Sequence, residues 1–214
     1  MNMKTIDLAF PMSGVEVPRD HGYALYGALC RAIPSLHDVR WLSVHPLPGK
    51  PAGADRLQVP AGGALRLRMP PGHIATVLPL AGATIDVAGA ELRLGAPVVH
   101  ALVPAASLDA RLVVVKLTDV PTHDHPTLGR KALDRGAIEQ RVHKELIRQL
   151  GLLGISANPE LRGHGRMRVA GRAVVGFSVR VQGLDADASL ALQTNGLGGK
   201  RKMGCGVFRP TRGA

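Results

Sequence analysis

Residues 196–208 read Gly196-Leu197-Gly198-Gly199-Lys200-Arg201-Lys202-Met203-Gly204-Cys205-Gly206-Val207-Phe208. Five glycines in eleven positions permit positive φ angles and a close approach of the backbone to a ligand. Exposed amides in such a loop form a nest that binds anions, and three consecutive cations add positive charge. The stretch therefore predicts a phosphate-binding loop. The alternative is an exposed basic hairpin turn, although a plain turn needs only one or two glycines.

The loop matches neither of the common nucleotide-binding motifs. A P-loop needs Ser or Thr after its lysine, whereas Lys200 is followed by Arg201. A Rossmann fingerprint follows the first strand of a fold and opens a helix. This loop lies near the C-terminus and follows a predicted helix over 186–194. Both nucleotide-binding folds are therefore disfavoured.

Outside the loop, the apolar pattern in each half of the chain predicts strands and helices in a similar order. The period of the apolar residues separates helices from strands. In the second half we expect a helix over 134–150, a hairpin over 167–182 that turns near Gly171, the helix over 186–194 and a strand over 205–209. In the first half we expect strands over 6–12, 39–44, 64–70, 98–103 and 112–117, a helix from an Asp20 N-cap to Pro34, a loop over 45–63, a short helix over 71–80 and a hairpin over 84–94.

This order is that of the ferredoxin-like fold, which RNA recognition modules also use. We therefore predict an α+β protein of two tandem ferredoxin-like domains, 1–117 and 118–214. Residues 118–132 would form the linker between them.

Charge is unevenly distributed along the chain. The formal net charge is +11, with 11 Lys/Arg against 8 Asp/Glu in 1–117 and 16 against 8 in 118–214. An excess in one half favours a surface for a polyanion, although scattered solvated charge is the alternative. Aromatic residues make up only 3%. Recognition through phosphates and helix shape is thus favoured over base stacking.

Two groups of basic residues extend the predicted binding surface beyond the loop. On the helix over 134–150, three cations share one face at spacings i, i+3 and i+7. A second group precedes the hairpin turn. The alternative for the helix is an ordinary solvated face. The members of the two groups are Arg141, Lys144 and Arg148, and Arg162, Arg166 and Arg168.

The chain resembles the CRISPR repeat-processing endoribonucleases of the repeat-associated RNA-binding superfamily. Gly196, Gly198, Gly204 and Gly206 match the four glycines of that family's C-terminal loop. The segments 20–26 and 34–37 are similar to its first helix and the loop that follows. The resemblance implies two tandem ferredoxin-like domains that bind CRISPR repeat RNA, often as a stem-loop. It also implies cleavage by a neighbouring 2′-hydroxyl without a metal ion or cofactor, leaving 2′,3′-cyclic phosphate and 5′-hydroxyl ends.

The reaction implied by this resemblance needs a general base, a proton donor and a cation near the phosphate. His37 lies where the family often keeps a catalytic histidine. His21 is the second candidate, with a capping turn as its alternative role. Tyr26 could bind the phosphate or pack in the core, and Arg31 could offset developing charge.

Other residues indicate neither a metal site nor export. His123-Asp124-His125 has no second ligand set and is interpreted as a solvated linker. Cys30 and Cys205 are typical of reduced thiols in a cytoplasmic protein. No leader or membrane span is expected.

Two other functions stay open at this stage. One is a non-catalytic guide-RNA-binding subunit of a CRISPR effector complex, whose other subunits would be partners. The other is a housekeeping ferredoxin-like RNA-binding protein.

Overall fold

The N-terminal sheet is built around β1 (Ile6–Pro11), which lies between β6 (Ala64–Met69) and β9 (Val98–Ala101). The strand β3 (Ser43–Val44) completes the order β3-β6-β1-β9, and every pairing is antiparallel. The computed structural model describes residues 5–12, 16–117 and 135–211.

Two helical segments connect these strands. The helix α1 (Gly22–Ala32) follows β1, and it packs Leu25 and Leu29 against the apolar face of the sheet. The short helix α2 (Ile74–Val77), with the 3-10 turns η2 (Pro71–His73) and η3 (Leu78–Leu80), precedes β9. The strand order and connections are those of a ferredoxin-like unit.

The second sheet repeats this arrangement. Its order is β11-β12-β10-β13, with β10 at Ser107–Val113, β11 at Pro159–Val169, β12 at Arg172–Gln182 and β13 at Arg209–Pro210. The helix α3 (Arg135–Leu152) buries Val142, Leu146 and Leu150, as the apolar spacing predicts. The helix α4 (Ala186–Asn195) begins where the Asp185 carboxylate accepts a hydrogen bond from the Ala188 N–H.

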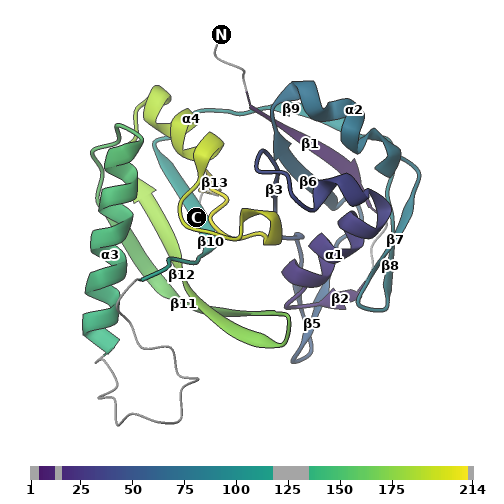
Figure 1. Cartoon of the computed structure of the whole chain (residues 1–214), viewed down its shortest axis with the longest axis horizontal. Helices are drawn as coiled ribbons and strands as arrows, with labels where there is room; N and C mark the ends of the chain where they lie inside the picture. Colours follow the sequence, from purple (N-terminus) through teal and green to yellow (C-terminus); the bar gives the residue numbers. More distant parts are fainter. Residues whose placement is uncertain (1–4, 13–15, 118–134, 212–214) are drawn as a thin grey trace.

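The tandem ferredoxin-like prediction is confirmed. Both sheets have the same strand order, and both have a helix after their first and third strands. Figure 1 shows α3 on the outer side of the second sheet, and the yellow C-terminal segment lying between the two halves.

Several local expectations differ from the structure. The expected loop over 45–63 contains β4 (Lys50–Ala52) and β5 (Arg56–Gln58), which join β2 (Glu16–Pro18) in a small sheet. The strand expected over 112–117 is β10, five residues earlier at its start. Because β10 pairs with β12 and β13, the second sheet begins before residue 118. In contrast, the hairpin expected over 84–94 is confirmed, and it consists of β7 (Thr84–Val87) and β8 (Ala90–Arg93).

Asp20 does not cap α1. The N-cap position is His21, without a side-chain cap, and the Asp20 carboxylate instead accepts from the Arg168 N–H at 2.6 Å. This contact holds the β11–β12 hairpin against the beginning of α1. The described helices include none with the length and apolar character that a membrane crossing requires.

Candidate nucleic-acid interface and active site

The glycine-rich loop over 196–206 connects α4 to the end of the chain and packs against β10. Gly206 donates its N–H to the Leu112 carbonyl at 2.7 Å, and Gly199 donates to the Val114 carbonyl at 2.9 Å. Gly198 has a φ of +71° and Gly206 a φ of +65°. A Cβ at Gly198 would collide with the Val114 carbonyl oxygen, and one at Gly206 with that of Leu197. These positions therefore require glycine for both conformation and space.

The glycine amides do not form the expected nest of exposed donors. The N–H groups of all five loop glycines donate to acceptors inside the protein, so they are not available to a phosphate. The glycines shape the loop, and its cations are the side chains that can meet RNA. The five glycines are Gly196, Gly198, Gly199, Gly204 and Gly206.

The three loop cations point in different directions around the turn η4 (Arg201–Met203). Lys200, in a left-handed conformation, is exposed. Arg201 donates from Nη1 to the Asn195 carbonyl at 2.6 Å, and burial lowers the pKa of its guanidinium. Lys202 reaches the other half of the chain, where its Nζ donates to the His37 carbonyl at 2.6 Å.

His37 and Lys202 form a composite site from two segments far apart in the sequence. α1 ends at Ala32, and the turn η1 (Pro34–Leu36) brings His37 to the surface with 74% of its side chain exposed. The His37 Nδ1 lies 3.0 Å from the Asp38 carboxylate. An Nδ1–H donated to Asp38 leaves Nε2 with the lone pair that a general base needs.

Tyr26 contacts both His37 and Lys202. Its hydroxyl lies 2.6 Å from the His37 carbonyl and 3.1 Å from that of Leu36, and the Lys202 Nζ lies 5.0 Å from its ring centroid. Burial, followed by hydrogen bonding to Cys30, raises the pKa of the Tyr26 hydroxyl. Tyr26 is therefore a neutral hydroxyl that holds the backbone of His37, and its ring makes a cation–π contact with Lys202.

The other two catalytic candidates are engaged elsewhere. His21 is fully buried, with Nε2 accepting from the Leu47 N–H at 3.0 Å and Nδ1 3.1 Å from the Pro18 carbonyl. Burial lowers the pKa of the His21 imidazole to about 4. Both ring nitrogens are used inside the protein, so we assign His21 a structural role. Arg31 reaches the β7–β8 hairpin instead of His37, since its Nη2 donates to the Asp86 carbonyl at 2.8 Å.

The basic face predicted for α3 is present. Arg141 and Lys144 are exposed, whereas Arg148 makes a bidentate pair with Glu145 at 2.7 Å. Gln149 donates to the same carboxylate and accepts from the Gly198 N–H at 2.7 Å. These contacts attach α3 to the glycine-rich loop.

The cations of β11 continue this surface. Arg166 and Arg168 have exposed side chains on the hairpin that Asp20 holds at α1. Arg162 lies 3.5 Å from Glu160 and lines a hollow that also includes Arg111 and Arg209.

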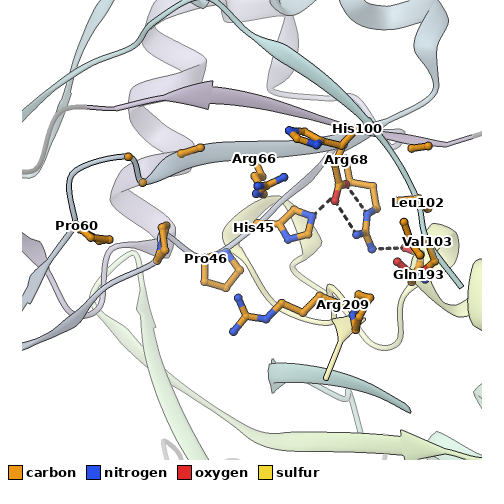
Figure 2. A pocket seen from close by; sticks show the side chains of 17 residues that line it. His45, Pro46, Pro60, Arg66, Arg68, His100, Leu102, Val103, Gln193 and Arg209 are labelled. Carbon is orange, nitrogen blue, oxygen red and sulfur yellow. Dashed lines mark hydrogen bonds and ion pairs between the residues drawn. The ribbon is translucent and has the colours of Figure 1, made fainter. Parts of the chain in front are cut away.

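A cleft of about 500 Å³ lies between the two halves, and its lining combines residues of both sheets (Figure 2). Arg66 and His100 come from the N-terminal sheet, and Arg209 comes from β13. Because Arg209 also lines the hollow beside Arg111, positive charge continues from one sheet to the other.

No group of three or more His, Cys, Asp or Glu that could hold a metal ion occurs among residues 5–12, 16–117 and 135–211. His123-Asp124-His125 lies outside the described residues.

Comparison with known proteins identifies the family. The family profile described as "Cas6 Crispr" matches residues 6–213. The chain belongs to the Cas6 family. A Myxococcus xanthus relative described as "CRISPR-associated endonuclease Cas6" is 39% identical over 208 residues, which are 97% of this chain and 82% of the relative.

Solved structures share the Cas6 fold over almost the whole chain. One described as "CRISPR associated protein Cas6" has a TM-score of 0.66 at 14% identity and covers 98% of this chain and 100% of its own. Another, described as "An RAMP protein binding different RNA substrates", has a TM-score of 0.67 at 11% identity, with 97% and 100% covered. The resemblance to repeat-processing endoribonucleases is thereby confirmed, and the chain is a Cas6 family endonuclease of CRISPR processing.

The cations of the cleft in this Cas6 chain were not among the residues predicted from the sequence. Arg66 and Arg68 alternate with Leu65 and Leu67 along β6, so they lie on the opposite face from the core. The two arginines on that face could have been identified from the alternation in the sequence alone. No local pattern predicts the contribution of Arg209, because it depends on how β13 pairs with β10 in the second sheet.

Proposed function

We propose that this chain binds CRISPR repeat RNA and cuts the precursor transcript to crRNA, using the neighbouring 2′-hydroxyl as nucleophile and no metal ion. The observation that carries this proposal is the contact between Lys202 and the His37 carbonyl. The ammonium group of Lys202 is thereby held at the backbone of a residue whose exposed imidazole has its Nδ1 3.0 Å from the Asp38 carboxylate. Family membership supplies the context of CRISPR processing.

The geometry suits a reaction that needs proton transfer and charge stabilisation. His37 takes the proton of the 2′-hydroxyl through Nε2 or returns one to the leaving 5′-oxygen, and the products are a 2′,3′-cyclic phosphate and a 5′-hydroxyl. Lys202 lies where it can offset negative charge on the phosphorane-like transition state. Tyr26 positions the backbone of His37 and takes no part in proton transfer.

The charged surfaces around this site would hold the RNA. Lys200 lies in the same loop as Lys202, Arg166 and Arg168 lie on the hairpin held at the beginning of α1, and Lys144 is exposed on α3. The cleft residues Arg66 and Arg209 offer further contacts to phosphates. Most of these contacts would be with the backbone, so sequence preference would come from RNA shape and a few unpaired bases.

The test is single-turnover cleavage of labelled repeat RNA in EDTA. We expect the wild type to cut, and a single 2′-deoxy substitution at the scissile nucleotide to block the cut. His37→Ala should lower the rate by about 100-fold or more while affinity for the repeat changes little. His143→Gln is the matched control, because His143 lies on α3 away from its basic face and bonds Asn158.

Two results would refute the proposal. Cleavage that survives the 2′-deoxy substitution would remove the 2′-hydroxyl as nucleophile, and full activity of His37→Ala would remove His37 from the mechanism. Tight repeat binding without any cleavage would favour the non-catalytic guide-RNA subunit, which works with other subunits of an effector complex. Equal affinity for repeat RNA and generic tRNA would favour the housekeeping RNA-binding protein.

A further inference from the structure

Arg68 is a buried charged residue that lies between the two halves of the protein. It lies on β6 with 3% of its side chain exposed. Its Nε and Nη2 donate to the two carboxylate oxygens of Asp7 on β1, at 2.7 and 3.0 Å. His45 lies 3.2 Å from the same carboxylate, and Figure 2 shows His45 and Arg68 close together at the wall of the cleft. The buried charge is thus neutralised within the N-terminal sheet.

The third nitrogen of Arg68 bonds the other half of the chain. Its Nη1 donates to the Gln193 carbonyl at 2.8 Å and to the Phe208 carbonyl at 2.6 Å. Gln193 lies in α4 shortly before the glycine-rich loop, and Phe208 lies two residues beyond Gly206. One buried nitrogen therefore holds both ends of the 196–206 loop. Charge-assisted hydrogen bonds of this kind are strong in a site that excludes water.

The loop held in this way delivers Lys202 to His37. Its own amides attach it to β10, which belongs to the second sheet. Arg68 connects its two ends to the first sheet, against which α1 and the turn carrying His37 are packed. The distance between the Lys202 ammonium and His37 thus depends on how the two sheets are connected. The hydrogen bonds of Arg68 form this connection.

We infer that Arg68 is a positioning residue for RNA cleavage, acting through Lys202. The inference rests on the proposed function, because it assigns Arg68 a role in the same reaction. A lysine cannot replace this arrangement, since one ammonium group cannot form a bidentate pair with Asp7 and also reach two carbonyls. Arg68 does not touch the RNA at the site of cleavage.

The variant Arg68→Lys tests this inference, and Asp7→Asn is its matched control. Arg68→Gln is less suitable, because it leaves the Asp7 carboxylate buried without a cation and endangers folding. Asp7→Asn removes the negative charge of the pair, so it also costs stability through the buried Arg68 charge, but it leaves Nη1 on both loop carbonyls. We expect Arg68→Lys to lower the single-turnover rate by about 10-fold or more, with the Kd for repeat RNA within about 2-fold. Asp7→Asn should lose stability yet keep the rate within about 3-fold.

A double-mutant cycle with Lys202→Ala separates positioning from general damage. If Arg68 acts through Lys202, Arg68→Lys should cost less than about 2-fold in the Lys202→Ala background. Additive losses, an unchanged rate for Arg68→Lys, or equal losses for Arg68→Lys and Asp7→Asn would overturn the inference.

Amide hydrogen exchange gives a readout that does not depend on cleavage. Arg68→Lys should speed exchange at Gly204 and Gly206 by about 10-fold, while amides in the centre of α3 keep the wild-type rate. Unchanged loop exchange would overturn the inference even in a protein that cuts RNA. A wild type that never cuts RNA would instead refute the proposed function.

Discussion

The buried His21 makes the stability of this protein sensitive to mild acid. Its ring joins the Pro18 carbonyl to the Leu47 N–H, and burial, followed by the charge of Arg111, lowers the pKa of the imidazole from 6.5 to about 4. The folded chain therefore keeps His21 neutral at a pH where the unfolded chain binds a proton. The neutral ring contributes its full stability above about pH 6.5, and this contribution falls as the pH drops toward 4.

The size of the effect follows from this lowering of the pKa. The loss attributable to His21 between pH 7 and pH 4 is roughly 3 kcal/mol, a large part of the free energy of unfolding of a typical domain. Asp7 adds to the acid sensitivity at lower pH. Although burial raises the pKa of its carboxyl, hydrogen bonds from His45 and Arg68 hold that pKa well below its ordinary value.

The assay is urea unfolding of wild type and His21→Asn at several pH values from 7.5 to 4.5. His21→Asn does not titrate, and it keeps a donor near Pro18 while losing the acceptor for Leu47. The wild type should be more stable at pH 7, and the gap between the two proteins should narrow by about 2–3 kcal/mol as the pH falls. Other titrating groups are common to both chains and cancel in this difference. Two curves that stay parallel would refute the reasoning, because His21 would then carry the same proton in both states.

Two further predictions concern the glycine-rich loop. Gly206→Ala should destabilise the protein by about 2 kcal/mol or more in thermal unfolding, because alanine disfavours positive φ and its Cβ would meet the Leu197 carbonyl. Gly89→Ala is the matched control, with a φ of +81° but open space around the Cβ, and equal losses for the two would exclude the packing explanation. Replacing Lys200, Arg201 and Lys202 by alanine should weaken RNA binding. The slope of log affinity against log salt concentration should become shallower by about 1–2, because each lost phosphate contact contributes roughly 0.7 to that slope. A salt slope equal to that of the wild type would mean that the loop does not meet phosphate.

Local patterns in the sequence predicted most of the architecture. Period-two alternation identified β1 and β6, and the apolar stripe of 142, 146 and 150 identified α3. The short strands β4 and β5 were missed, because proline and glycine around them indicate a loop. β4 pairs with β5, and the pairing of β5 with β2 depends on a segment more than thirty residues earlier, which no local period reports.

The candidate site was predicted only in part, for a related reason. The spacing of glycines and cations indicated the glycine-rich loop, whereas His37 was suggested only by the resemblance to the family. Residue type could not separate His37 from His21, because one histidine is exposed and the other is enclosed only once β2 and the 45–47 segment cover α1. Burial is a property of the assembled fold, and it decides whether an imidazole can exchange a proton.

Periodicity, glycine content and charge were enough to indicate two ferredoxin-like units and a cationic C-terminal half. Packing alone decided that Lys202 meets His37, 165 positions away, and that Arg68 bonds carbonyls 125 and 140 positions away. The physical reason is the separation along the chain over which each interaction acts. Hydrophobic alternation and glycine preferences act between neighbours in the chain, whereas these hydrogen bonds form only after two separately folded sheets have come together.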